Sequence, residues 1–281
     1  MSVTAVGPAY PLVGPPPHRR EHALLSIPGV LVDDPSDPPR WLTQVNVIGY
    51  PDGVPQLWEA CSSGTDRVKG SASPRPQGTF NPFAAVFPLE CWTASIGPFT
   101  EFYGQADAAL DATLSHSIEE ALAQGIDTNP FFGDTGFISL GLNVSPIIGL
   151  AMLENAIGFD TGREGMIHAS PAIVAQWTYG NNLYIDDEGV LRTYNDTPVA
   201  AGSGYIGRHP TGGGGLPAAT ATSDWAYATG PVEVRVEAEP RHRIEETLDR
   251  NDNTVIVYSE RYVLAEWDTA LQVGVLIDWT L

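Results

Sequence analysis

The segment "NDNTVIVYSERYVLAEW" (residues 251–267) decides how this chain can fold. Its polar start leads into the apolar run Val255–Tyr258, and the apolar residues resume after the three residues Ser259–Arg261. Consecutive apolar residues make both faces of a strand apolar, which is not the pattern of an amphipathic surface hairpin. A strand of this kind is normally covered on both faces. We therefore expect a buried strand with an acid and an arginine at its centre, and the rest of the chain must supply what covers it.

The composition limits the kinds of protein that this chain can be. Of its 281 residues 43% are hydrophobic, which is enough to bury one large core or two linked ones. Lysines and arginines number 14 and acidic residues 34, so the net charge is −20. Binding to a nucleic-acid backbone relies on clustered cations, and this charge argues against it.

Targeting, redox and metal signals are few. The longest apolar stretches, such as residues 144–153, fall well short of the ~20 residues that a membrane helix needs. The N-terminus lacks a basic segment followed by an apolar one, so we expect no signal peptide and synthesis in the cytoplasm. Cys61 and Cys91 are too few for a disulfide framework or a closed zinc site, and no cofactor is expected.

The first 92 residues predict an arm followed by a long hairpin. Prolines throughout residues 1–40 disfavour helix and interior strand, which predicts an extended arm. Alternating apolar residues begin at Trp41, and an extended segment returns over 80–92. Between them, residues 62–78 are rich in Gly, Ser and Pro, which is typical of a mobile loop tip. We expect that neither arm nor hairpin can bury its apolar residues on its own body, and such surfaces indicate assembly.

Helices and short strands follow, which indicates an α+β fold. The apolar spacing over 99–125, ended by Gly125, predicts a helix of about 35 Å or more. A second helix starts after Ser145 with a proline at its first position, and a third covers 171–177. Short strands are expected over 165–168, 189–193, 198–201, 205–206, 225–229 and 232–237.

Three features invite enzymatic interpretations. "DTG" occurs at 134–136 and 160–162, but an aspartic dyad needs two carboxylates about 3 Å apart on separate lobes, so we expect turns. "GSGYIG" at 202–207 matches GxGxxG without the strand–turn–helix context of a dinucleotide site, which predicts a loop. The six histidines include no ligand pair on one helix. An aspartyl hydrolase built on the two DTG turns is the rival hypothesis from another class.

In order along the chain, these segments resemble the major capsid proteins of tailed bacteriophages, the Hong Kong 97 phage fold that encapsulin shells share. "GMIHASPAIVAQW" (165–177) resembles the family's strand and following helix, and "LRTYNDTPVAAGSGYIG" (191–207) its strand, turn and glycine sequence. "DWAYATGPVEVRVE" (224–237) is similar to the strand pair, and "NTVIVYSERYVLAEWDTALQVGVL" (253–276) to the closing strand. Ser259 departs from the family, which often has a glutamate there.

The resemblance implies a division of the chain and a set of contacts. The implied parts are an arm (1–42), an E-loop hairpin (43–92), a peripheral domain (93–128 and 231–268) and an axial domain (129–230 and 269–281). The resemblance implies that the strand of 251–267 lies in the sheet of the peripheral domain against the long helix of 99–125. It also implies contacts between subunits for Trp58, Arg67, Lys69, Glu260 and Arg261.

The resemblance also bears on Lys69, the only lysine of the chain. In some relatives an E-loop lysine forms an isopeptide bond with an asparagine of a neighbour's closing strand, and a nearby glutamate accepts the proton. Asn251 and Asn253 lie near the equivalent place, but Ser259 replaces the acid and Glu260 would point to the other face. We therefore expect an uncross-linked shell in which Lys69 contacts a carboxylate of the adjacent subunit.

The function that the resemblance implies is structural and not enzymatic. The chain would be a major capsid protein of a virion, assembling into the hexamers and pentamers of an icosahedral phage head around double-stranded DNA. Its main partner would be itself, with decoration, scaffold and portal proteins as further partners, and it would bind neither membrane nor specific nucleic acid. An encapsulin-like nanocompartment shell is the alternative on the same fold.

Overall fold

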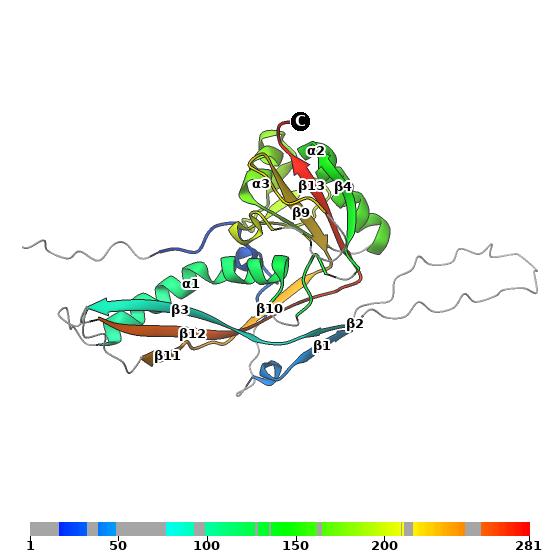
Figure 1. Cartoon of the computed structure of the whole chain (residues 1–281). Helices are drawn as coiled ribbons and strands as arrows, with labels where there is room; N and C mark the ends of the chain where they lie inside the picture. Colours follow the sequence, from blue (N-terminus) through cyan, green and yellow to red (C-terminus); the bar gives the residue numbers. More distant parts are fainter. Residues whose placement is uncertain are drawn as a thin grey trace, which may run out of the picture.

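The described residues form two bodies joined at a waist (Figure 1). The structure is a computed structural model that describes residues 17–32, 39–48, 77–92, 99–126, 129–134, 136–161, 165–208, 210, 216–244 and 254–281. The lower body holds the long helix α1 (Phe99–Gln124) and a four-stranded sheet. The upper body holds a five-stranded sheet with two helices, so the fold class is α+β, as the sequence predicts.

The strand β12 (Thr254–Trp267) is the centre of the lower sheet. One of its edges pairs antiparallel with the whole of β3 (Phe83–Trp92) up to Val263. Its other edge pairs antiparallel with β11 (Arg241–Ile244) and then with β10 (Val232–Val236). Because β12 has partners on both edges, its backbone hydrogen bonds are satisfied along most of its length.

The helix α1 covers one face of β12, which answers the question that the opening segment raised. Val257 and Ser259 are fully buried on this face, and the Ser259 hydroxyl bonds to Asp107 of α1. Alternate residues of a strand point to opposite faces. Tyr258 therefore lies on the other face, where it is half-buried, and Leu264 on that face is fully buried.

The upper body is built on a mixed sheet. Its strands are, in spatial order, β4 (Ile138–Val144), β13 (Gln272–Asp278), β9 (Ser223–Thr229), β5 (Met166–Ala169) and β8 (Val199–Ala201). β13 pairs parallel with β4 and β5 pairs parallel with β8, while the pairs with β9 are antiparallel.

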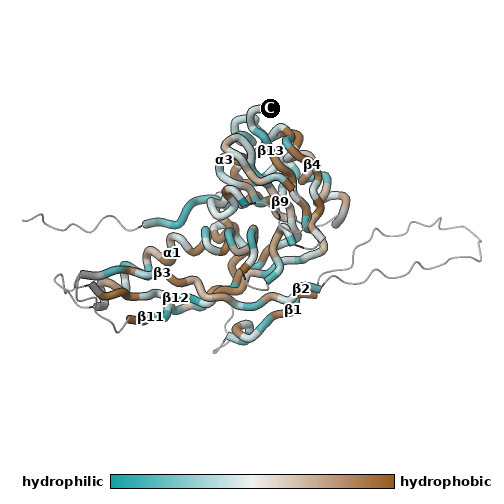
Figure 2. Tube along the Cα trace, viewed as in Figure 1, coloured by the Kyte–Doolittle hydropathy of each residue, from teal (hydrophilic) through white to brown (hydrophobic). Residues whose placement is uncertain are grey.

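Two helices pack on this sheet. α2 (Pro146–Ala156) and α3 (Pro171–Tyr179) each begin with a proline after a serine, as the sequence predicts. The indole of Trp177 in α3 is fully buried and donates to the carbonyl of Pro146 at 2.8 Å, which ties the helices together. Two hydrophobic cores result, one around α1 and β12 and one beneath α2 and α3, and Figure 2 shows the apolar segments of both bodies.

Two small hairpin ladders complete the fold. β1 (Val45–Ile48) pairs antiparallel with β2 (Gln77–Phe80), at the base of the expected long hairpin, whose residues 49–76 lie outside the described part. The sequence placed residues 83–92 in the same hairpin, but as β3 they belong to the lower sheet. β6 (Leu183–Ile185) and β7 (Leu191–Thr193) form the second ladder, on the upper body.

Residues 17–32 pack on their own body, which corrects the expectation that the arm cannot bury its apolar residues there. The buried residues of this segment include Leu24, Leu25, Ile27 and Val30, and Leu24 and Leu25 belong to the short 3-10 turn η1 (Leu24–Ser26). The backbone of Val234 in β10 exchanges hydrogen bonds with Val30 and Val32 at 2.7 and 2.9 Å. Proline disfavours interior helix and strand, but it does not prevent a buried turn.

Several short elements differ from the sequence prediction. β4, β6, β11 and β13 were not expected, and residues 203–205 form a 3-10 turn, η5 (Ser203–Tyr205), instead of a strand. β11 is polar except for its last residue, Ile244, and is ordered by pairing with β12, not by an apolar face of its own. Edge strands of this kind carry a weak local signal.

Candidate assembly surface

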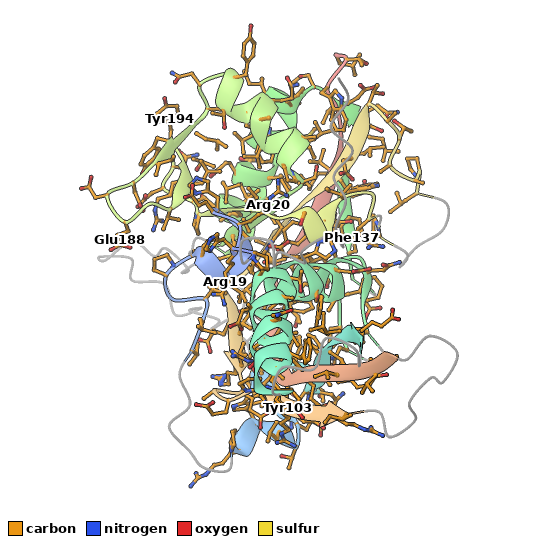
Figure 3. All side chains as sticks on the ribbon, turned by 90° about the vertical axis from the view of Figure 1, so that its left-hand side faces the viewer. Arg19, Arg20, Tyr103, Phe137, Glu188 and Tyr194 are labelled. Carbon is orange, nitrogen blue, oxygen red and sulfur yellow. The ribbon has the colours of Figure 1, made fainter. Side chains whose placement is uncertain are left out.

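A polar cluster fixes the lower end of α1 to the sheet. The carboxylate of Asp107 in α1 accepts from the Ser259 hydroxyl at 2.5 Å, and lies 2.9 Å from the Nε2 atom of His242 in β11. The ring of His242 stacks on Tyr103, with centroids 4.4 Å apart, at the lower end of the molecule (Figure 3). Ser259, the residue that departs from the family pattern, is therefore a bridge between helix and sheet.

The two charged residues at the centre of β12 lie on opposite faces. Arg261 lies on the α1 side, where its guanidinium is 3.2 Å from a carboxylate oxygen of Asp111 in the same chain. Glu260 lies on the other side, opposite Arg241 of β11 in the strand register. The Arg261 contact that the structure describes is thus internal, while the contacts of both residues with other subunits stay a prediction.

The remaining predicted contact residues cannot be placed. Trp58, Arg67 and Lys69 lie outside the described residues, as do Asn251 and Asn253. The structure therefore leaves the E-loop contacts and the cross-link as predictions from the sequence.

Glu119 of α1 joins three parts of the chain at the waist. Its side chain is almost fully buried, and one carboxylate oxygen accepts from the backbone N–H of Leu24 and from the Ser115 hydroxyl, both at 3.0 Å. The other oxygen accepts from the backbone N–H of Gly204 at 3.0 Å. Burial raises the pKa of Glu119, and these three hydrogen bonds oppose the rise. The carboxylate thus holds the N-terminal segment and the upper body on the long helix.

The glycines of "GSGYIG" make this contact possible. A Cβ atom on Gly202 would lie 2.3 Å from the Glu119 carboxylate, and one on Gly204 would lie 2.4 Å from the carbonyl oxygen of His116. Both distances are far below van der Waals contact, so only glycine fits at either position. The motif is a loop, as expected, and the anion that it approaches is a side chain of the same protein. The sequence analysis did not single out Glu119. The signal that could have identified it is a charged residue directly beside the apolar positions of the predicted helix.

His168 is a structural histidine of the upper body. It is fully buried, with Nδ1 3.0 Å from the Tyr205 hydroxyl and Nε2 3.0 Å from the Thr229 hydroxyl. Because Thr229 donates its own proton to the carbonyl of Gly230, Nε2 must be the donor and Nδ1 the acceptor. Burial lowers the pKa of His168 to about 3, so the neutral ring is the stable form.

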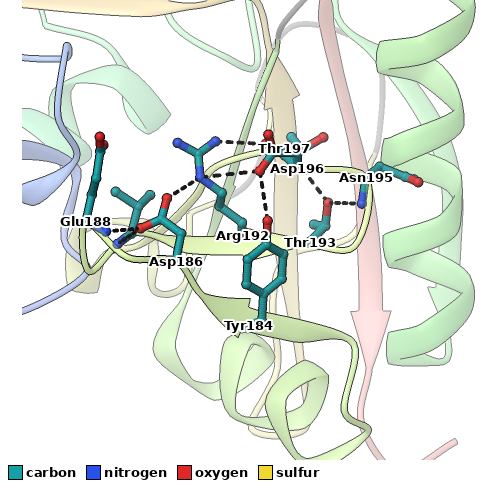
Figure 4. A network of polar contacts seen from close by, with 9 residues as sticks. Tyr184, Asp186, Glu188, Arg192, Thr193, Asn195, Asp196 and Thr197 are labelled. Carbon is teal, nitrogen blue, oxygen red and sulfur yellow. Dashed lines mark hydrogen bonds and ion pairs between the residues drawn. The ribbon is translucent and has the colours of Figure 1, made fainter.

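A hydrogen-bond network braces the hairpin β6–β7 (Figure 4). The Arg192 Nε–H donates to Asp186 at 2.5 Å, and the same guanidinium donates to the carbonyl of Asp196 at 2.9 Å. The Tyr184 hydroxyl donates to the Asp196 carboxylate at 2.8 Å, and its ring stacks on Tyr194. The guanidinium of Arg192 holds the pKa of Asp186 below its ordinary value. The network thus ties the exposed ring of Tyr184 to the turn that follows β7.

The upper body exposes many large apolar side chains. Tyr179, Phe159 and Tyr194 are 91%, 81% and 65% exposed. Further exposed apolar residues of this body are Ile138, Leu142, Ile147, Ile148, Ile185 and Ile206. Scattered apolar residues are normal on a protein surface, so these side chains are candidate positions for protein contacts and not one defined patch. We call this group the upper apolar surface.

The structure describes the two DTG motifs only in part. Asp134 is described, but the side chain of Asp160 is not, so the structure leaves the proposed dyad untested. Within the described ranges, His, Cys, Asp and Glu form no group of three that could hold a metal ion. No helix in the same ranges is long and apolar enough to span a membrane.

Comparison by sequence finds neither a protein family nor a curated protein that matches. Solved structures do match. The capsid of the native GTA particle has a TM-score of 0.54 at 11% identity, over 99% of this chain and 95% of that one. A structure of Mycobacterium phage Ogopogo has a TM-score of 0.53 at 11% identity over 96% of both chains, and one of Microbacterium phage Oxtober96 has 0.50 at 9% over 98% and 96%.

These matches define the class of the fold as that of capsid proteins. They extend over almost the whole chain, so the long helix and both sheets take part together. More particularly, the chain shares the fold of the GTA capsid and of the two phage structures, which confirms at the level of the fold the resemblance seen in the sequence.

Proposed function

We propose that this chain is a structural, non-enzymatic major capsid protein that assembles into hexamers and pentamers of a closed icosahedral shell around double-stranded DNA. The observation that carries the proposal is the likeness to the capsid of the GTA particle over 99% of the chain. A likeness that extends over almost the whole chain supports a role in which the fold itself is the function.

The surface of the chain supports self-association. The upper apolar surface has no cover within the described residues, and the hairpin base β1–β2 carries Ile48 with 56% exposure. Apolar side chains presented in this way are stabilised when a neighbour buries them. Repeated contacts between different patches of identical subunits close into rings of five or six.

The two bodies suggest how the domains divide. We assign the lower body to the peripheral domain (93–128 and 231–268) and the upper body to the axial domain (129–230 and 269–281). The assignment is supported by β13, whose residues follow β12 directly yet pair in the upper sheet. Residues 1–42 and 43–92 are then the arm and the E-loop, and β3 is the part of the E-loop range that is anchored in the peripheral sheet.

The charge of the chain fits a container for DNA. At a net charge of −20, the shell wall and a nucleic-acid backbone repel each other, so DNA is enclosed without adhering. Decoration, scaffold and portal proteins are the further partners that a phage head would need. An encapsulin-like shell is the alternative use of the same fold, and it would hold a cargo protein instead of DNA.

Electron microscopy and light scattering of the purified protein test the proposal. We expect closed shells or capsomers of five and six that persist in salt, because apolar burial does not depend on ionic strength. A stable monomer of 30.1 kDa at all concentrations and salts would contradict it. Shells that co-purify with a cargo protein, and never with DNA, would favour the encapsulin alternative.

A further inference from the structure

A groove on the upper body has the size and the walls of a binding site. It lies between α2 and the β6–β7 hairpin and has a volume of about 620 Å³, within the range of about 300–1,000 Å³ that is usual for ligand sites. Ile147, Phe159 and Tyr194 line it and are all more than half exposed, and the buried Leu150 borders it as well. Because its apolar walls are open to solvent, the groove suits a segment of a protein better than an enclosed small molecule.

The charges around this groove are mostly negative. Residues 182–197 contain four acidic side chains and one cation, Arg192, and Glu154 of α2 adds an acid in the groove itself. Arg192 is already engaged by Asp186 at 2.5 Å. The hydrogen bonds that Glu154 accepts come from two neutral side chains, both at 3.1 Å. The groove and its rim therefore keep an excess of negative charge, which attracts a cationic partner.

Tyr194 and Asp196 together offer a place for a guanidinium group. Tyr194 is 65% exposed, and the side chain of Asp196 is 74% exposed. Tyr184 links the two, because its ring stacks on Tyr194 and its hydroxyl donates to Oδ1 of Asp196 (Figure 4). An arginine can stack on an exposed aromatic ring and donate to a neighbouring carboxylate, whereas the ammonium group of a lysine is a point charge. The geometry therefore favours arginine as the cation of the partner.

The charge of the whole chain favours a different protein over a second copy as the occupant. With 34 acidic and 14 basic residues, the chain has a net charge of −20, so a second copy is repelled by an acidic groove. Nucleic acid is repelled for the same reason. A basic segment with apolar side chains is attracted by the rim, and its apolar side chains can cover Ile147 and Phe159.

We propose that the groove between α2 and the β6–β7 hairpin binds an arginine-rich segment of another protein that also carries apolar side chains. The apolar side chains lie against Ile147 and Phe159, and an arginine stacks on Tyr194 and pairs with Asp196. The groove and its charge belong to the single chain, so this inference is independent of the proposed function. Because the charged contacts lie at an exposed rim, binding should weaken as the salt concentration rises.

Fluorescence anisotropy with a synthetic peptide tests the proposal. The probe is the labelled peptide RLLRRLLRRLLR, which has an apolar face between cations when it is helical, and it is added to the purified full chain. We expect saturable binding that weakens with salt. Glutamate in place of every arginine, or serine in place of every leucine, should weaken binding by at least about tenfold, and lysine in place of arginine by about threefold. Equal binding of the serine peptide or the glutamate peptide overturns the proposal.

Matched variants locate the contact. Tyr194→Ala removes an aromatic wall and should weaken binding of the arginine peptide by about tenfold, whereas Tyr194→Phe keeps the ring and should retain binding. Tyr179→Ala removes a tyrosine that is even more exposed but does not line the groove, and should leave binding unchanged. Equal affinities of the two alanine variants count against the groove.

A second pair of variants controls for the charge of the chain. Asp196→Asn and Glu239→Gln each remove one exposed negative charge, and Glu239 lies on the lower body between β10 and β11. General attraction to an acidic chain changes equally in both. Asp196→Asn alone should weaken binding, by about threefold or more, because it removes a carboxylate that pairs with the arginine. Equal losses in both variants contradict a defined site.

Electron microscopy of the same samples separates this inference from the proposed function. Closed shells that bind no peptide reject the groove as a site and leave the proposed function standing, whereas a monomer that binds the peptide does the reverse. Peptide that binds dissociated subunits but not closed shells assigns the groove to a contact between copies, and the proposed occupant is then wrong.

Discussion

Removal of the Glu119 side chain should release the N-terminal segment and the η5 turn from α1. In the Glu119→Ala variant, the buried backbone N–H groups of Leu24 and Gly204 lose their acceptor. A buried donor without a partner costs about 1–3 kcal/mol, so the two together cost about 2–6 kcal/mol. Part of this is offset because the variant no longer buries a carboxylate. We therefore expect the free energy of unfolding to fall by about 2–5 kcal/mol.

The neighbouring residue provides the control. Glu120 pairs with Arg208 at 2.5 Å, but its side chain is 42% exposed. An exposed ion pair contributes at most ~1 kcal/mol, so Glu120→Ala should be mild. Urea unfolding of dissociated subunits measures both variants, and hydrogen exchange at Leu24 should be fast in Glu119→Ala alone.

The pH dependence gives a second test of the same site. Burial raises the pKa of Glu119 in the folded state, so the folded chain binds this proton more tightly than the unfolded chain. The stabilisation is complete below the ordinary pKa of glutamate and is lost as the pH rises through the folded value. The difference between wild type and Glu119→Ala should thus be larger near pH 4 than at pH 8. A loss below 1 kcal/mol, with unchanged exchange at Leu24, would refute the role assigned to this carboxylate.

Three further predictions concern single residues. Burial lowers the pKa of His168 to about 3, so on acidification the unfolded chain binds this proton first. The free energy of unfolding should therefore fall by about 1.4 kcal/mol per pH unit below about pH 6.5. A His168→Gln variant whose free energy of unfolding falls equally steeply with pH would disprove this. Gly204→Ala should lower the free energy of unfolding by roughly 1–3 kcal/mol through overpacking. Gly104→Ala in α1, where the added Cβ meets open space, should raise it by up to ~1 kcal/mol. Thermal unfolding compares the two variants. For Lys69 we expect a single band near the monomer mass on a denaturing gel of mature particles, and a ladder that disappears in Lys69→Ala would show the opposite.

The predictable part of the fold was the part with strong local signals. The helix predicted over 99–125 is α1, which ends at Gln124, and Gly125 directly after it has the φ of +88° that glycine supplies at a helix end. The serine–proline pairs predicted the starts of α2 and α3, because proline lacks the N–H that the first helical turn leaves unpaired. These features act over a few residues, so they can be recognised without knowledge of distant contacts.

The sequence also predicted the buried strand and, through the resemblance, its place against the long helix. That β12 is covered followed from its apolar residues on both faces. The hydrogen bond from Ser259 to Asp107, by which α1 is tied to this strand, joins residues 152 positions apart and was not predicted. β11 and β13 were missed because a short polar edge strand and an apolar run beside a turn have no distinctive period, and pairing with a partner decides their state.

The sequence by itself determined an acidic α+β chain, its main helices, its closing strand and its resemblance to phage capsid proteins. Tertiary structure alone decided that the arm residues near Leu24 are buried, that the glycines at 202 and 204 approach a carboxylate, and that a groove forms beside Tyr194. The physical reason is the range of the interactions. Capping, periodicity and charge are properties of neighbouring residues, whereas the burial of Glu119 and the walls of the groove exist only where segments far apart in the chain pack together.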